Sequence, residues 1–211
     1  MKLFISRSES SLGQLTKDIS SKGVELCAQS LIAFESIPFN LNQDYDWVFF
    51  GSRNGVKYFL SQSDIKVDAK VACVGQKTAD YLLENHQIKS HFIGEGTDTT
   101  TIGESFRKVS NGKILFPQSN ISLQSIQKKL EDSEIVDLLC YKTRFTSNKI
   151  DKQDIYFFTS PSNIDSYLEQ NQIDPNAKYF CLGSSTEQKL TFLNVFSIQT
   201  IPSISDILKF I

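Results

Sequence analysis

The chain has 211 residues, and its 22 lysine and arginine residues against 24 aspartate and glutamate residues give a formal net charge of −2. This balance argues against a general nucleic-acid-binding protein, which usually carries a basic stripe. No apolar run approaches the ~18 residues of a membrane span, and residues 1–7 turn polar too early for a signal peptide. We therefore expect a globular cytoplasmic protein with one large domain or two small ones.

Short apolar runs alternate with polar, helix-like stretches along the chain. Strands are predicted at residues 2–5, 24–28, 47–50, 71–74, 90–93, 113–116, 135–140, 155–158, 179–182 and 195–200. Helices are predicted at residues 12–21, 54–61, 78–85, 101–109 and 123–130, after the strands at 155–158 and 179–182, and from residue 205. This alternation predicts βα units, parallel sheets and the α/β class.

The cysteines and histidines predict neither a disulfide framework nor a metal site. The cysteines form no C-x-x-C pair and are spread along the chain: Cys27, Cys73, Cys140 and Cys181. We expect four free, mostly buried thiols in a reducing compartment. His86 and His91 are five residues apart and far from any cysteine, so a zinc site is not expected.

The chain contains an internal repeat. Two motif pairs share an offset of 108 residues: 46–52 with 154–160, and 73–78 with 181–186. A weaker third match, with a shifted offset, pairs the apolar runs that begin at Lys2 and Lys113. The repeat predicts a tandem duplication with two similar α/β lobes, and taken alone it would divide the chain near residue 112.

The repeated motifs end predicted strands and open predicted helices. Gly75 and Gly183 permit tight turns there, and hydroxyl or amide side chains occupy the same turns: Ser52, Asn54, Thr78, Ser160, Asn163 and Thr186. Backbone N–H groups at helix starts bind anions, and parallel sheets gather such turns at their carboxyl edge. The alternative interpretation is that these side chains only cap their own helices.

Familiar catalytic motifs are missing from the sequence. It has no G-x-G-x-x-G, no Walker loop and no G-x-S-x-G, and neither histidine lies at a βα turn. Tyr141 ends the apolar run at residues 136–141 and precedes the polar residues 142–144. We therefore expect Tyr141 to lie at the end of a strand, where the chain leaves the sheet.

Six short motifs cover nearly the whole chain: residues 50–56 (FGSRNGV), 74–79 (VGQKTA), 115–117 (LFP), 141–143 (YKT), 158–163 (FTSPSN) and 182–186 (LGSST). Their order and spacing resemble those of the uroporphyrinogen-III synthase family. The resemblance implies two flavodoxin-like or Rossmann-like lobes with parallel sheets, joined by a two-stranded linker. It places residues 1–35 and 149–211 in one discontinuous lobe and residues 40–140 in the other, with linker strands at 31–39 and 141–148.

The resemblance also implies a reaction. Members of the family are lyases of tetrapyrrole and haem biosynthesis that cyclise hydroxymethylbilane to uroporphyrinogen III, with inversion of ring D and loss of water. They use no metal and no cofactor. For this chain the resemblance implies a linear tetrapyrrole as the only partner, with no nucleic acid and no membrane, and we expect a monomer.

Site residues follow from the matching motif positions. Tyr141 matches the tyrosine proposed to assist departure of the hydroxyl group, and a phenol with a pKa of ~10 can donate a hydrogen bond without ionising. The residues that match substrate-contacting positions are Arg7, Ser52, Asn54, Gly75, Thr78, Ser160, Ser162, Asn163, Gly183, Ser185 and Thr186.

Two turns depart from the family pattern. Gly51 stands where the family commonly has threonine, and residues 118–120 (QSN) replace a glycine and a later arginine. A non-catalytic, two-lobed protein that binds an anionic ligand therefore remains an alternative to the enzyme. A flavodoxin-like nucleotide-binding or flavin-binding protein is a third hypothesis, although residues 6–13 match a phosphate loop only partly.

Overall fold

The computed structural model describes residues 1–96, 98–130 and 133–211. These residues form two compact units: unit 1 comprises Met1–Ala33 and Arg144–Ile211, and unit 2 comprises Phe34–Thr143. The chain passes between the units within two strands, β3 (Ile32–Ser36) and β8 (Glu134–Phe145). These two strands are hydrogen-bonded neighbours in one sheet.

Unit 1 contains a parallel sheet with the strand order β11-β10-β9-β1-β2. Its strands are β1 (Lys2–Ile5), β2 (Glu25–Ala28), β9 (Ile155–Phe158), β10 (Lys178–Cys181) and β11 (Ile198–Thr200). Its helices are η1 (Glu9–Ser11), α1 (Gln14–Ser21), α5 (Pro161–Leu168), α6 (Ser184–Phe192) and η3 (Ile204–Lys209), of which η1 and η3 are 3-10 helices. Because β1 pairs with both β2 and β9, the first residues of the chain share a sheet with its last third.

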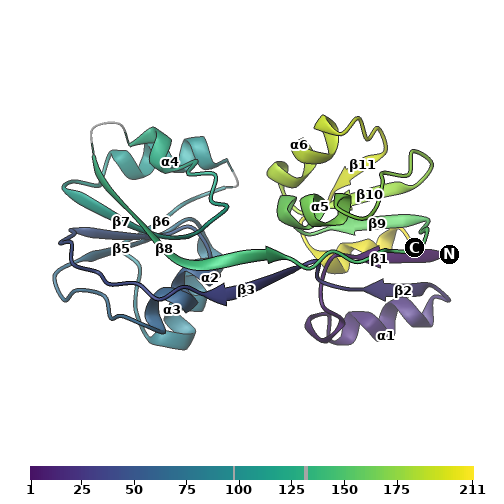
Figure 1. Cartoon of the computed structure of the whole chain (residues 1–211), viewed down its shortest axis with the longest axis horizontal. Helices are drawn as coiled ribbons and strands as arrows, with labels where there is room; N and C mark the ends of the chain where they lie inside the picture. Colours follow the sequence, from purple (N-terminus) through teal and green to yellow (C-terminus); the bar gives the residue numbers. More distant parts are fainter. Residues whose placement is uncertain (97, 131–132) are drawn as a thin grey trace. The chain divides into compact units, whose positions relative to one another are not determined.

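Helices cover both faces of the unit 1 sheet (Figure 1). On one face, Ile19 of α1 and Ile207 of η3 pack into a single core. On the other face, Ile164 of α5 and Leu190 of α6 pack into a second core. Strands that are buried on both faces read as continuous apolar runs, which explains why the sequence revealed them so clearly.

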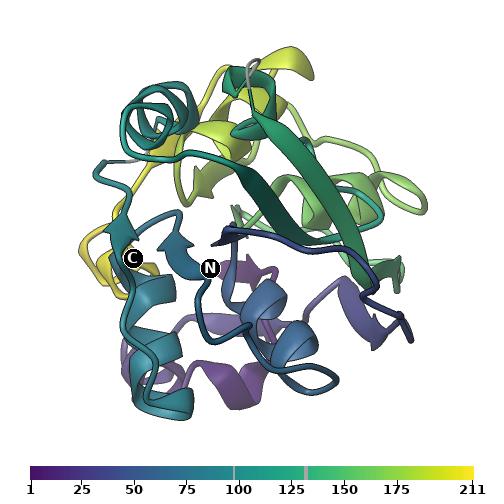
Figure 2. The ribbon, with the colours of Figure 1, turned by 90° about the vertical axis from the view of Figure 1, so that its left-hand side faces the viewer.

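Unit 2 contains a sheet with the strand order β3-β8-β7-β4-β5-β6. Its remaining strands are β4 (Trp47–Phe50), β5 (Lys70–Cys73), β6 (Phe92–Ile93) and β7 (Lys113–Ser119). Its helices are α2 (Arg53–Leu60), α3 (Gln76–His86), α4 (Thr99–Arg107) and the 3-10 turn η2 (Gln127–Lys129). The pairs from β8 to β6 are parallel, and Figure 2 shows β8 as the long green strand.

The unit 2 sheet is also covered on both faces. Phe59 of α2 and Leu82 of α3 pack on one face, and Phe106 of α4 packs with Leu130 on the other. The predicted α/β class, with parallel strands and helices on both faces, is confirmed in both units.

The predicted helix at residues 123–130 is wrong. Gln124 adopts a left-handed conformation with φ 53°, which interrupts a helix, and the turn η2 replaces it. Ile126 is nevertheless buried. Gly103 of α4 leaves room for this turn, because a Cβ at Gly103 would lie 2.8 Å from Cβ of Lys129. The apolar spacing therefore marked a buried face and not a helix.

Equivalent hydrogen bonds occur in the two units at positions that the sequence repeat pairs. In unit 2, Asp46 Oδ2 accepts the backbone N–H of Lys113 at 2.7 Å. In unit 1, Asp154 Oδ2 accepts the backbone N–H of Lys2 at 2.7 Å. The backbone N–H of each aspartate donates to the carbonyl of the same lysine, at 2.8 and 3.0 Å. The weak sequence match between Lys2 and Lys113 thus marks two equivalent strand starts.

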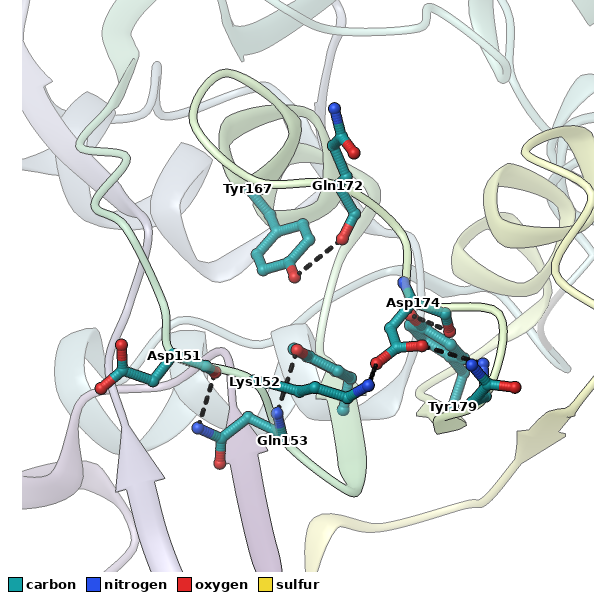
Figure 3. Close-up of polar contacts among 9 residues, drawn as sticks. Asp151, Lys152, Gln153, Tyr167, Gln172, Asp174 and Tyr179 are labelled. Atoms are coloured by element: carbon teal, nitrogen blue, oxygen red, sulfur yellow. Dashed lines mark hydrogen bonds and ion pairs between the residues drawn. The ribbon is translucent and has the colours of Figure 1, made fainter.

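Tyrosine hydroxyl groups hold the loops at the amino ends of β9 and β10 (Figure 3). Tyr167 donates to the carbonyl of Gln172 at 3.1 Å. Tyr179 donates to the carbonyl of Asp174 at 3.0 Å and accepts its backbone N–H at 2.8 Å. Burial raises the pKa of Tyr179 to about 12, so the phenol stays protonated and remains a donor. These contacts stabilise the sheet edge opposite the strand ends that carry the predicted site residues.

Candidate functional site

In unit 1 the predicted site residues follow three neighbouring strands at their carboxyl ends. Arg7 lies just after β1, the FTSPSN turn follows β9, and the LGSST turn follows β10. Since the strand order is β10-β9-β1, these three turns lie together at one edge of the sheet. Both helices that start there direct their N-terminal backbone N–H groups to this edge, which favours anions.

Two hydroxyl groups join the turns after β1 and β9. Ser6 Oγ accepts the backbone N–H of Thr159 at 2.8 Å, and the Thr159 hydroxyl donates to the Ser6 carbonyl at 2.9 Å. Ser6 is buried. This pair of contacts fixes the turn that carries Arg7, which is itself half-buried.

Ser160 and Asn163 bind each other, and Asn163 also binds a distant part of unit 1. Ser160 is the N-cap of α5, and its Oγ accepts the backbone N–H of Asn163 at 3.3 Å. Asn163 is only 3% exposed. Its Nδ2 donates to Ser160 Oγ at 2.9 Å, and its Oδ1 accepts the backbone N–H of Leu31 at 3.0 Å. The Asn163 side chain therefore fixes the chain just before β3, while Ser162 beside it is half-buried.

The turn before α6 depends on a glycine. Gly183 has φ 72° and ψ 161°, a region that is essentially restricted to glycine. Thr186 is buried behind it, whereas Ser185 is exposed at the start of the helix. The backbone N–H groups of this first turn and the Ser185 hydroxyl are the groups that can reach a ligand.

In unit 2 the corresponding residues follow the neighbouring strands β4 and β5. Ser52 is the N-cap of α2, and its Oγ accepts the backbone N–H of Gly55 at 3.1 Å. Gly75 is the N-cap residue of α3 with extended backbone, and Thr78 is buried in its first turn. Asn54 is half-buried in the first turn of α2. Unit 2 thus presents a second pair of helix starts.

The first turn of α2 lies close to the end of β7. A Cβ at Gly55 would come within 3.0 Å of the Pro117 carbonyl oxygen, so glycine permits this approach. The Ser52 hydroxyl lies 3.3 Å from the phenol oxygen of Tyr141 on β8. This distance is long for a hydrogen bond between hydroxyls, and catalytic contacts often tighten only when substrate binds.

The expectation that Tyr141 ends its strand is wrong. Strand β8 continues to Phe145 because it pairs with β3 as well as with β7. At its β7 side the register shifts between Gln118 and Ser119, so that Ser119 pairs with Tyr141. This irregularity lies directly at the tyrosine, and bulges of this kind often re-aim a side chain.

The Tyr141 phenol lies in a mostly apolar environment with hydroxyl partners. The residue is 7% exposed. Burial raises the pKa of Tyr141, and hydrogen bonds with Ser52 and Ser119 lower it, with burial the larger effect. The phenol is therefore protonated at neutral pH, so it can donate a hydrogen bond or a proton, and its oxygen can still accept a hydrogen bond.

Two thiols near this site are not nucleophiles. Burial raises the pKa of Cys73, at the end of β5, to about 11, and that of Cys140, beside Tyr141, to about 12. Thiolates, and not thiols, are the reactive form. The cysteines are free, as predicted, and three of them are buried.

Three residues near the phenol were not singled out from the sequence. Tyr58 stacks on Tyr141 with ring centres 5.1 Å apart, Phe34 contacts it edge-on at 6.0 Å, and Ser119 hydrogen-bonds it. Tyr58 lies six residues after Ser52, on the helix that Ser52 caps, so the sequence alone could have placed Tyr58 near the site. Phe34 and Ser119 lie on other strands, and only the sheet order brings them near.

The turn that departs from the family pattern has its own contacts. Asn120 Oδ1 accepts the backbone N–H of Thr143 at 2.8 Å. The QSN turn therefore ties the end of β7 to β8 two residues beyond Tyr141. Residues 118–120, which depart from the family pattern, thus have a structural role in this chain.

The described parts of unit 1 contain an open surface pocket. The pocket, of about 620 Å³, is lined by Tyr156, Tyr167 and the loops before β9 and β10, so it lies away from the predicted residues. Across residues 1–96, 98–130 and 133–211, no three His, Cys, Asp or Glu side chains come together as metal ligands. No helix of the described chain is long and apolar enough to cross a bilayer.

Solved structures share this fold. A mutant uroporphyrinogen III synthase from Thermus thermophilus is 14% identical and has a TM-score of 0.69, with 99% of this chain and 96% of that chain covered. A uroporphyrinogen-III synthetase from Helicobacter pylori is 16% identical with a TM-score of 0.69, covering 99% and 97%. The wild-type Thermus protein is 15% identical with a TM-score of 0.52, covering 99% and 95%.

The family comparison extends beyond the fold. No curated protein sequence matched the chain. The family model described as uroporphyrinogen-III synthase HemD matches residues 13–208. That span includes all the described site turns except the one at Arg7. Because the match covers nearly the whole sequence, the chain belongs to the uroporphyrinogen-III synthase family.

Proposed function

We propose that this chain is a cytoplasmic, monomeric lyase that cyclises hydroxymethylbilane to uroporphyrinogen III. Family membership supports the reaction. The single observation that supports catalysis by this chain is the Tyr141 phenol, which is buried, protonated and held against the Ser52 hydroxyl at 3.3 Å. A protonated donor is what departure of a hydroxyl group requires.

Tyr141 assists departure of the substrate hydroxyl in this proposal. The carbon–oxygen bond of the hydroxymethyl group breaks, its electron pair goes to oxygen, and the oxygen leaves as water with a proton from the phenol. The resulting azafulvene cation is attacked by the substituted carbon of ring D, and the spiro intermediate fragments and recloses. The proton released when the macrocycle rearomatises restores the phenol, so the sum is substrate to product plus water.

The helix starts bind the carboxylates of the substrate. In unit 1 the groups are Arg7, Ser160, Ser162, Asn163, Gly183, Ser185 and Thr186, and in unit 2 they are Ser52, Asn54, Gly75 and Thr78. Most of these contacts are backbone N–H groups at the starts of α2, α3, α5 and α6. Thr78, Asn163 and Thr186 act by shaping their turns, since all three are buried. Positioning of a flexible chain is the main task, because ring closure without inversion competes.

Product analysis tests the proposal. Hydroxymethylbilane is generated enzymatically, the purified chain is added, and the oxidised products are separated by chromatography. We expect the type III isomer, whereas the same mixture without the chain gives the type I isomer. An unchanged type I product would reject the enzymatic function and leave a binding role.

A further inference from the structure

The ring of Tyr141 is held between two aromatic side chains from other elements of unit 2. Tyr58 of α2 stacks on it with ring centres 5.1 Å apart and an angle of 18°. Phe34 of β3 meets it edge-on, at 6.0 Å and 63°. Both arrangements are favourable for aromatic pairs, so they restrict the positions that the phenol can take.

A hydrogen bond also links the two residues that flank Tyr141. The Tyr58 hydroxyl donates to the Phe34 carbonyl at 3.2 Å. One turn later, Gln62 Nε2 donates to the carbonyl of Ile37 at 3.1 Å, and the Ile37 N–H donates to the Cys140 carbonyl at 3.0 Å. Helix α2, β3 and β8 are thus linked around the tyrosine.

Helix α2 contacts both ends of the Tyr141 side chain. Its N-cap, Ser52, reaches the phenol oxygen at 3.3 Å, and Tyr58, two turns further, covers the face of the ring. Since the Tyr58 hydroxyl is engaged with a backbone carbonyl, Tyr58 itself is not the donor to a substrate. Its ring and hydroxyl fix where the donor lies.

We propose that Tyr58 is a positioning residue that sets the orientation of the Tyr141 phenol for proton donation. This inference rests on the proposed role of Tyr141. The stacked ring keeps water from one face of the phenol, and the hydrogen bond to Phe34 keeps the stacked ring in place. A small displacement of a catalytic group costs rate without weakening substrate binding.

The test compares Tyr58→Leu, which removes the stacked ring, with Tyr58→Phe, which removes only the hydroxyl. Each substitution is made in the natural chain and in the Tyr141→Phe variant. Tyr81→Leu is the control, because Tyr81 is also half-buried but lies on α3 beside His86. If Tyr58→Leu does not fold, Tyr58→Met replaces it.

We expect Tyr58→Leu to lower kcat by about tenfold, the loss that we also expect when the phenol is removed and a water replaces it. KM should be nearly unchanged, and Tyr58→Leu should cause no further loss in the Tyr141→Phe variant. Tyr58→Phe keeps the stacked ring, so it should keep most of the turnover that Tyr58→Leu loses. The Tyr81→Leu control should keep its turnover. In NMR titrations of ring-labelled tyrosine, Tyr58→Leu should move the pKa of Tyr141 down toward the ordinary value, because burial is what raises it.

Several results would overturn the inference. An equal loss of turnover from Tyr58→Leu with and without the Tyr141 phenol would show a general structural role, and so would failure of both Tyr58→Leu and Tyr58→Met to fold. An unchanged Tyr141 titration would also reject it. If Tyr141→Phe is slow and Tyr58→Leu is not, the positioning role alone fails; if Tyr141→Phe keeps full turnover, the proposed role of Tyr141 fails.

Discussion

The hydroxyl oxygens of Ser52 and Tyr141 lie 3.3 Å apart, and the same Ser52 oxygen accepts the Gly55 N–H. When Ser52 donates its own proton to the phenol oxygen, the phenol proton stays available for another acceptor. One serine thereby caps α2 and orients the only side chain that we assign to proton donation. Substitutions at Ser52 and Tyr141 separate these two roles.

Tyr141→Phe should lower turnover about tenfold, less than the ~10²–10⁴-fold of strong general acids, because a water can replace the phenol. Product affinity and thermal stability should change little, since the ring and its stacking remain. Steady-state kinetics, with the ratio of type III to type I product, measures the effect. Unaltered turnover together with an unaltered isomer ratio would remove Tyr141 from the mechanism.

Ser52→Ala and Ser160→Ala form a matched pair, because both serines cap a helix at equivalent repeat positions. Each variant should lose about 1 kcal/mol of unfolding free energy through its lost cap. Only Ser52→Ala should also raise the pKa of Tyr141 further, since the Ser52 hydrogen bond lowers it. Denaturant unfolding and tyrosine NMR titration measure the two effects. Equal pKa values of Tyr141 in the two variants would contradict the hydrogen bond between Ser52 and Tyr141.

Tyr141 should lose its proton only at a pH above its ordinary pKa of 10.0, because burial raises the pKa. In the folded state the phenol holds its proton more tightly than in the unfolded chain. Its contribution to stability is therefore complete below pH ~10 and is lost as pH rises through the folded pKa. Turnover measured up to the pH of unfolding should show no loss attributable to Tyr141 near neutrality. An activity loss at pH ~8 that disappears in Tyr141→Phe would contradict this.

Gly183→Ala should destabilise the chain by about 1–3 kcal/mol, because alanine does not tolerate its backbone conformation. No atom lies within 4 Å of the added Cβ, so the cost is conformational and not steric. Gly75→Ala is the control, since Gly75 has extended backbone with φ −178°. Shifts in the denaturation midpoint compare the two. Equal costs would show that the φ of Gly183 is not what requires glycine.

Asn163→Ala should cost about 1–3 kcal/mol, because it leaves the Leu31 N–H without its buried acceptor. Asn85→Ala, at an exposed position of α3, should stay within about 0.5 kcal/mol. Thermal unfolding measures both variants. A silent Asn163→Ala would show that the amide is not needed to fix the chain before β3.

The sequence predicted the strands well because both sheets are covered on both faces. Residues 2–5, 47–50 and 155–158 were predicted with the bounds that the structure shows. Helix 123–130 failed because its apolar spacing is that of a buried turn, and one left-handed residue, Gln124, decides the difference.

The candidate site was predictable only in part. The capping serines and turn glycines are local signals, and their offset of 108 residues made them visible. The surroundings of Tyr141 depend on β3, β7 and α2 meeting β8, and no local pattern carries that information. Its strand end was misplaced for the same reason, because pairing with β3 extends β8 to Phe145.

The aspartates before β4 and β9 differ in when their partners are synthesised. Asp46 precedes Lys113 by 67 residues, so unit 2 emerges from the ribosome as one continuous stretch. Asp154 binds Lys2, which was made 152 residues earlier. Domains generally fold as units during synthesis. The strands β1 and β2 of the N-terminal segment can pair with each other at once, but the other edge of β1 must wait for β9, which is synthesised only after the whole of unit 2.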